Sequence, residues 1–174
     1  MGLLRRGRGQ DGPVASRYQM RQKLLSIGDD YWIEDDQGRR AFRVDGKALR
    51  VRQTFVLEDA HGKEVAKIQE RKLSVRDKMA IERRGSSIAT VKKALVGLRE
   101  RFSIHLEGGA DMRAKGNFLD HEYEIERDGR TVATISKRWF RMRDTYGVEI
   151  APGEDDALVL AIAVCVDAMS DGRD

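Results

Sequence analysis

The chain has 174 residues, of which 40% are hydrophobic and 36% are charged, with 17 glycines and only two prolines. This length allows one domain with a substantial core and is short for two, and the composition is that of a soluble globular protein with a highly charged surface. The single cysteine excludes an intramolecular disulfide and is consistent with a reducing cytoplasm.

The formal net charge of +4 comes from the N-terminal segment. Residues 1–23 contain one acid, Asp11, and six basic residues, which give them +5 and leave −1 for residues 24–174: Arg5, Arg6, Arg8, Arg17, Arg21 and Lys23. Proteins that bind nucleic acid usually carry a basic face on the folded domain, so we expect no specific nucleic-acid partner. Residues 1–17 also lack the apolar region of a secretory signal. We interpret 1–17 as a basic, flexible arm and 18–174 as a single domain.

A short pattern that occurs four times predicts four β-hairpins. Each copy has an apolar residue followed by Glu, a polar turn that ends in Gly, and then apolar residues at fixed spacing. The copies begin at Ile33, Leu57, Ile81 and Ile125, and the last two are one residue shorter. The glycine supplies the positive φ that a tight return of the chain requires. Successive hairpins without long helices between them predict an antiparallel sheet, which closure into a barrel would leave without exposed edges.

Further strands are predicted at 48–55, 73–77, 102–106 and 146–150 from alternation and β-branched or aromatic residues. Turns or loops are expected at 28–30, Asp45-Gly46, Gly108-Gly109 and Gly116-Asn117. Residues 90–101 are ambiguous. Lys92–Leu95 is compatible with the start of a helix, but Gly97 interrupts it and the hairpin context favours a strand.

The C-terminal segment predicts a buried helix. Pro152-Gly153 interrupts the chain, and the three acids at 154–156 then suit a first helical turn. Residues 157–166 are all apolar, so this helix must be enclosed by protein or lipid. A membrane span needs about 20 apolar residues, which favours protein. The valines leave a buried strand as the alternative, and in either case we expect Cys165 to be buried and unreactive.

From about Tyr18 to Met169 the chain resembles the LURP-one-related family, whose relatives are the tubby C-terminal domain and the phospholipid scramblases. The resemblance rests on the opening segment 20–33, the repeated Glu-Asp-x-x-Gly turns, and residues 146–150 followed by the apolar helix. It implies a mainly β fold, a closed antiparallel barrel of about twelve strands around a central hydrophobic C-terminal helix. Tubby domains bind phosphoinositide head groups, and scramblase relatives act at membranes.

The densest basic and aromatic cluster predicts a surface for an anionic ligand. It consists of Lys137, Arg138, Trp139, Arg141 and Arg143, with Phe140 and Met142 between them. Basic residues beside aromatic ones favour an anionic membrane surface. The alternative is a strand with Trp139 turned inward and the arginines in solvent. We interpret the other basic clusters, at 71–84 and 92–101, as salt-bridged strand surface.

No residue pattern predicts catalysis, a metal site or a cofactor. We expect His61 to be a turn residue and His105 and His121 to be strand residues, and no two of them have metal-ligand spacing. The acids of the repeated turns recur with the turns, which favours a structural role for them. The sequence therefore predicts a non-enzymatic cytoplasmic protein that binds an anionic ligand, such as a phospholipid head group, at a membrane surface. A protein-interaction scaffold without a lipid ligand is the alternative.

Overall fold

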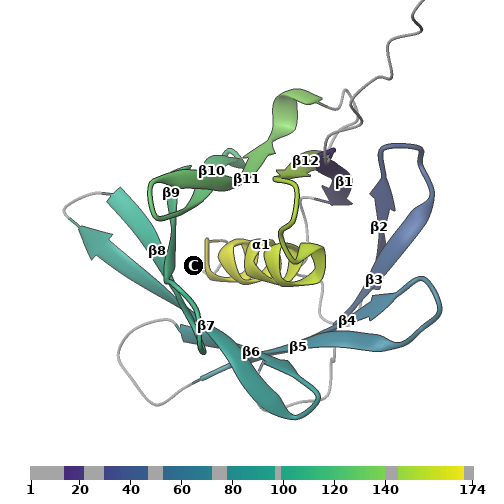
Figure 1. Ribbon diagram of the computed structural model, residues 1–174, viewed down its shortest axis with the longest axis horizontal. Helices are drawn as coiled ribbons and strands as arrows, with labels where there is room; N and C mark the ends of the chain where they lie inside the picture. Colours follow the sequence, from purple (N-terminus) through teal and green to yellow (C-terminus); the bar gives the residue numbers. More distant parts are fainter. Residues whose placement is uncertain are drawn as a thin grey trace, which may run out of the picture.

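Figure 1 shows a computed structural model of the protein, which describes residues 14–21, 30–46, 53–71, 78–96, 99–139 and 145–170. In these residues twelve β-strands surround one α-helix. The first six strands are β1 (Ser16–Arg21), β2 (Tyr31–Asp35), β3 (Arg40–Gly46), β4 (Thr54–Asp59), β5 (Glu64–Glu70) and β6 (Lys78–Arg83). The remaining elements are β7 (Ser86–Val96), β8 (Arg99–Leu106), β9 (Met112–Asn117), β10 (Glu122–Arg127), β11 (Arg130–Ser136), the short 3₁₀ helix η1 (Lys137–Trp139), β12 (Thr145–Ile150) and the helix α1 (Asp156–Ser170).

The strands form a closed antiparallel barrel, as predicted. Each strand pairs with its neighbours in the sequence, and β1 pairs with β12 from Ser16↔Ile150 to Arg21↔Thr145 to close the ring. We call the end of the barrel that carries the four repeated turns the hairpin end, and the opposite end the distal end. The helix α1 starts at the hairpin end, runs through the barrel, and finishes near the distal end (Figure 1).

The four sequence repeats are the hairpins β2–β3, β4–β5, β6–β7 and β10–β11. In each hairpin the strand register shifts at the same place, between the first apolar residue of the repeat and the Glu that follows it. A bulge of this kind bends the strand and increases its twist, which helps a sheet to curl into a barrel. The repeated Glu therefore marks a repeated bulge as well as a turn.

The one-residue difference between the repeats corresponds to two kinds of turn. In the longer copies Asp35 and Asp59 each accept two backbone hydrogen bonds across the turn through Oδ1, at 2.9–3.0 Å, and only the glycine has a positive φ. Backbone hydrogen bonds, from Arg39 and Lys63 respectively, are the main cause that lowers the pKa of these two carboxyls. In the shorter copies both turn residues have positive φ, Arg84-Gly85 and Asp128-Gly129, as a type I′ turn requires. Asp35 and Asp59 are therefore structural, as the sequence-based interpretation expected for the acids of the repeated turns.

Some predicted boundaries differ from the structure. The predicted strand 102–106 lies within β8 and 146–150 within β12, and residues 90–96 are strand, as the hairpin context favoured. Strand 48–55 overlaps β4 only from Thr54, while 47–52 and 72–77 lie outside the described residues. The predicted breaks at Asp45-Gly46 and Gly116-Asn117 were wrong, because these residues are the last two of β3 and β9. Strand pairing continues through glycine when the neighbouring strands supply partners.

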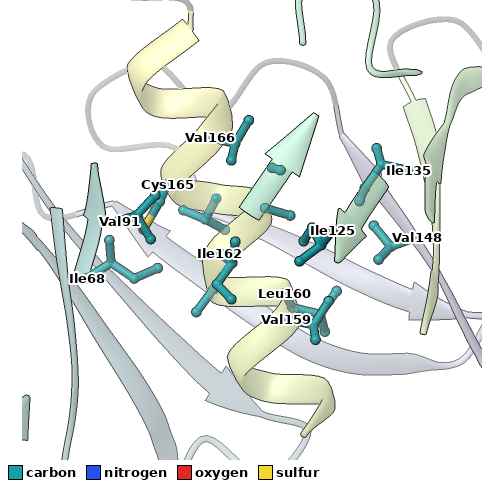
Figure 2. Packing of buried hydrophobic residues seen from close by; sticks show 14 of the residues in the cluster. Ile68, Val91, Ile125, Ile135, Val148, Val159, Leu160, Ile162, Cys165 and Val166 are labelled. Atoms are coloured by element: carbon teal, nitrogen blue, oxygen red, sulfur yellow. The ribbon is translucent and has the colours of Figure 1, made fainter. Parts of the chain in front are cut away.

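The core lies between α1 and the inner face of the barrel. Every residue from Val159 to Ser170 is buried, so the helix is enclosed on all sides, as its uniformly apolar sequence predicted. Figure 2 shows Ile162 and Cys165 beside inward-facing residues such as Ile68 and Val91. Burial raises the pKa of the Cys165 thiol, which is fully enclosed. In the part of the chain that the structure describes, no helix is long and apolar enough to cross a membrane.

Charged and polar groups hold the start of α1 at the hairpin end. Asp155 caps the helix by accepting a 3.0 Å hydrogen bond from the backbone N–H of Leu158, and it pairs with Arg83 of β6 at 2.8 Å. Glu154 pairs with Arg127 of β10, and Asp156 accepts a 2.5 Å hydrogen bond from the Tyr18 hydroxyl of β1. The acids predicted to begin the helix therefore connect it to three separate strands.

Candidate functional site

The cluster predicted to bind an anionic ligand lies at the distal end of the barrel. Lys137, Arg138 and Trp139 form the 3₁₀ helix η1 immediately after β11, whereas Arg141 and Arg143 lie outside the described residues. Trp139 is 44% exposed. The alternative of an extended strand with an inward Trp139 was therefore wrong, because the chain leaves the barrel wall at Lys137 and the alternation of strand faces ends there.

Glu122, the first residue of β10, fixes the start of η1. Its Oε1 accepts hydrogen bonds from the hydroxyl of Ser136 at 3.0 Å and from the backbone N–H of Lys137 at 3.1 Å. The Ser136 hydroxyl in turn accepts a 3.1 Å hydrogen bond from the backbone N–H of Arg138. These contacts hold the backbone of η1, while the Arg138 side chain stays 85% exposed, with Nε 3.8 Å from Glu122. The two basic residues and Trp139 are thus presented from a fixed turn.

A second exposed apolar residue, Leu119, lies at the same end of the barrel. It is 62% exposed and occupies the turn between β9 and β10, next to the strand end that carries η1. Asn117 and Asp120 close this turn, because the Asn117 amide donates to the Asp120 carboxylate at 2.6 Å and accepts from the Asp120 N–H at 3.2 Å. The distal end therefore combines two exposed apolar side chains with two cations, Lys137 and Arg138.

A buried polar cluster that the sequence analysis missed surrounds Asp167 near the end of α1. The Tyr146 hydroxyl of β12 donates a hydrogen bond to its carboxylate, and His121 Nε2 lies 3.2 Å from its other oxygen. The His121 ring stacks on Tyr146 with centroids 4.4 Å apart. His121 is 4% exposed and has a φ of 50°, in the turn before β10, so the prediction of a strand residue was wrong. An acid inside an apolar helix was the available signal, because a buried carboxylate requires partners.

Two further buried tyrosines lie close enough to Asp167 for its negative charge to affect them. Burial, and secondly the charge of Asp167, raise the pKa of Tyr31 and Tyr123 well above 10. Within the described ranges neither hydroxyl has a hydrogen-bond partner, and the same is true of His121 Nδ1. Since Asp167, Tyr146 and His121 are each less than 5% exposed, the cluster is closed to a substrate and contributes to the core. No group of three or more potential ligands is placed to hold a metal ion in the part of the chain that the structure describes.

The other basic clusters are only partly paired. In the cluster at 71–84, Arg71 lies 2.7 Å from Glu82 and Arg83 2.8 Å from Asp155, which agrees with the predicted salt bridges for these two residues. Lys93 differs, because it points inward. Its Nζ donates a 2.7 Å hydrogen bond to the carbonyl of Met169 and lies 3.2 Å from Glu100. A cation at this position complements the C-terminal end of the α1 dipole.

A groove of about 1280 Å³ opens beside the distal part of β8 and β9. One side carries Arg101 and Ser103, and the other carries Arg113 and Lys115. Toward the core it reaches an aromatic cluster in which the Phe118 ring lies 4.7 Å from Phe102 and 5.0 Å from Tyr123, measured between centroids. No short sequence pattern predicts this groove, because its position depends on where β8 and β9 stop pairing with each other.

Comparisons with known proteins agree with this architecture. A model of the family described as LURP-one-related matches residues 16–167. An Arabidopsis thaliana protein of known X-ray structure is similar, with a TM-score of 0.69 and 20% identity over 91% of this chain and 93% of that protein. At that identity the likeness shows the fold alone. A comparison with curated proteins gave no significant match. The extent of the family match and the closed twelve-stranded barrel with its C-terminal helix lead to one assignment: the chain belongs to the LURP-one-related family.

Proposed function

We propose that this protein is a non-enzymatic binding module that docks on anionic phospholipid surfaces through the distal end of its barrel. The observation that carries the proposal is the exposure of Trp139 beside Lys137 and Arg138 on a fixed turn, with Leu119 exposed on the neighbouring turn. The proposal places the protein at the periphery of a membrane, with head groups as its ligands.

The chemistry of these side chains suits the membrane interface. Tryptophan has an apolar ring with a polar N–H and accumulates at the boundary between head groups and acyl chains. Lys137 and Arg138 would each add about 1 kcal/mol of attraction to an anionic surface. Leu119 would insert beside Trp139. Together these groups give an interaction that weakens as salt screens the charges.

A binding role is favoured over catalysis by the arrangement of the titratable groups. The His121, Asp167 and Tyr146 side chains combine an acid, a base and a hydroxyl, yet all three are buried. The described groups at the exposed distal end, Lys137, Arg138, Trp139 and Leu119, do not form a nucleophile and its base. They are suited to contact a surface, and the sequence-based expectation of a non-enzymatic protein is retained in this proposal.

Co-sedimentation with vesicles tests the proposal. The protein should sediment with phosphatidylserine-containing vesicles and much less with phosphatidylcholine alone, at about 0.1 M salt, where exposed charges still attract over about 10 Å. Trp139→Ala and Arg138→Gln should each reduce the bound fraction severalfold. The matched controls are Val14→Ala, which changes an exposed apolar residue at the hairpin end, and Arg130→Gln, at the opposite end of β11.

Equal sedimentation with the two kinds of vesicle would contradict the proposal. So would equal losses in the distal variants and in the controls at the hairpin end. In either case, stoichiometric capture of a protein partner without lipid would favour the alternative of an interaction scaffold.

A further inference from the structure

The wall of the barrel is incompletely paired between β8 and β9. Their pairing covers Phe102↔Ala114, Ser103↔Arg113 and Ile104↔Met112. Both strands continue beyond this pairing toward the distal end. There β8 still pairs with β7 as far as Arg99, and β9 still pairs with β10 as far as Asn117. Residues 99–101 of β8 and 115–117 of β9 are therefore each paired on one side only, and they do not pair with each other. In Figure 1 the start of β8 diverges from β9.

Two basic side chains and an irregular glycine lie where the pairing stops. If the register continued by one residue, Arg101 would stand directly opposite Lys115 on the outer face of the barrel, and Arg113 is already adjacent. Like charges directly opposite each other on antiparallel strands are destabilising. Gly116, with a φ of 139°, adds an irregularity on the β9 side. The two strand edges therefore separate, and the groove described above lies at this separation.

The separation leaves backbone hydrogen-bonding groups without a sheet partner on two facing edges. Such an edge is a template for another extended chain, and strand addition to an exposed edge is a common mode of peptide recognition. A strand placed between β8 and β9 would be antiparallel to one of them and parallel to the other, and both arrangements provide regular hydrogen bonds. The edges alone therefore define the conformation of the ligand, which is an extended peptide.

The side chains of the groove define the sequence of that peptide. The outward side carries Arg101 and Arg113, both exposed, and neither has an ion-pair partner among the described residues. The acids of the groove are largely engaged: Glu100 lies 3.2 Å from Lys93, and Glu122 accepts the bonds from Ser136 and Lys137.

Lys115 lies 2.6 Å from Glu126 and stands opposite Glu124 in the strand register. Glu126 also stands opposite Arg113 in the register but pairs with Lys115, so the described outward-facing groups include two cations without an ion pair, Arg101 and Arg113, against one such acid, Glu124. The inward side of the groove is formed by the aromatic cluster of Phe102, Phe118 and Tyr123. Because successive side chains of a strand point to opposite faces, a bound strand meets cations with every second residue and apolar groups with the others.

We propose that this groove binds an extended peptide segment of a partner protein, with acidic and apolar residues in alternation, by adding it as a strand between β8 and β9. The proposal goes beyond lipid docking and needs no membrane. Carboxylates at alternate positions pair with Arg101 and Arg113, and the intervening apolar side chains face the aromatic cluster. Backbone hydrogen bonds to residues 99–101 or 115–117 supply the remaining contacts.

Binding of short labelled peptides to the full chain tests the proposal, with fluorescence anisotropy as the measurement and no lipid present. The probe is Glu-Val-Glu-Val-Glu, blocked at both ends. Two peptides of altered pattern serve as comparisons: Val-Val-Glu-Glu-Glu, which has the same composition without alternation, and Lys-Val-Lys-Val-Lys, which has the opposite charge. We expect the first probe to bind at least about tenfold more tightly than either comparison peptide, since both the register and the charge select it.

The double variant Arg101→Gln with Arg113→Gln should weaken binding of the probe about tenfold, in line with the loss of two partly exposed ion pairs. The double variant Lys63→Gln with Arg130→Gln is the matched control, because it removes the same charge at the hairpin end and should leave affinity unchanged. Amide hydrogen exchange supplies a second readout. The probe should protect amides within 99–101 or 115–117, and this protection should be absent with the Lys peptide.

Equal affinity for the alternating and non-alternating acidic peptides would overturn the proposal, because it would indicate charge attraction alone. Binding without protection of those amides would also overturn it, as would the lack of binding at about 1 mM probe. None of these outcomes bears on lipid docking, since the Trp139 and Arg138 variants are measured separately on vesicles.

Discussion

The two ends of α1 are attached to the barrel in different ways. At the hairpin end, Asp155 and Glu154 pair with arginines whose side chains are about one third exposed, and Tyr18 donates to Asp156 from a half-buried position. At the distal end, the contacts of Asp167 and Lys93 are enclosed, with side-chain exposures of 1% and 9%. The first set of contacts is open to water and salt, and the second is not.

This difference determines how much each contact contributes to stability. Exposed ion pairs contribute about 0–1 kcal/mol, because solvent screens them and ordered side chains lose entropy. Removing one partner of an enclosed polar contact costs more, since the remaining group stays buried without its hydrogen bond. The hairpin end therefore tolerates substitution better than the distal end, although it contains more formal ion pairs with the helix.

The largest expected effect is loss of folding when a charge is placed on the helix between its two attachments. Ile162→Asp should give an insoluble or unfolded chain, because Ile162 is fully buried and an unpaired carboxylate in the core costs several kcal/mol. Ile162→Val is the control, with an expected loss of about 1 kcal/mol. Circular dichroism and thermal melting distinguish the two. A soluble aspartate variant that melts near the wild-type temperature would refute the enclosed helix.

Alkaline pH should destabilise the fold through the buried tyrosines of the distal end. Folding raises the pKa of Tyr31, Tyr123 and Tyr146, through burial and then through the charge of Asp167, so folding favours their protonated forms. The tyrosine contribution to stability should be constant below pH ~10 and fall above it, by about 1.4 kcal/mol per pH unit for each tyrosine, and the buried Cys165 thiol should begin the fall earlier, near pH ~8.5. Tyrosinate absorbance should appear together with the loss of the circular dichroism signal. Titration of these phenols in a folded barrel near pH 10 would show that they are solvated.

The same substitution at different tyrosines compares the ends directly. Tyr146→Phe removes the donor to the buried Asp167 and should cost about 2–3 kcal/mol, whereas Tyr18→Phe removes the half-buried donor to Asp156 and should cost about 1 kcal/mol or less. Tyr123→Phe should be neutral or slightly stabilising, because its hydroxyl has no partner in the described ranges. Urea unfolding measures all three. Equal costs for Tyr146→Phe and Tyr18→Phe would remove the distinction between the ends.

The fold could be predicted largely from local chemistry. Glycine turns, alternating strands and an apolar segment after three acids are determined by neighbouring residues, and they led to the barrel and its helix. The repeated Glu could not be recognised as a bulge, because a bulge is a relation between two strands. Likewise, the alternative of an inward Trp139 assumed that the strand continued past Ser136, whereas the hydrogen bonds to Glu122 begin a turn there.

The candidate sites depend on contacts between distant residues, which no local pattern encodes. In the sequence His121 follows Asp120, whereas its buried partner is Asp167, near the end of α1. The groove results from the register of β8 against β9, which brings Arg101 toward Lys115. Neither relation has a sequence signature, although a buried acid in α1 indicated that a partner had to exist.

The pairing of β1 with β12 also has a consequence for the biosynthesis of the protein. Arg17 and Glu149, which form an ion pair across this seam, are 132 positions apart in the sequence. A ribosome that adds about 5–20 residues per second delivers the first strand several seconds before its partner. The ring cannot close, and α1 cannot be enclosed, until β12 and α1 have been made. During that interval β1 and the unclosed sheet present free edges, so the nascent chain depends on chaperones or on its own charged residues to avoid association.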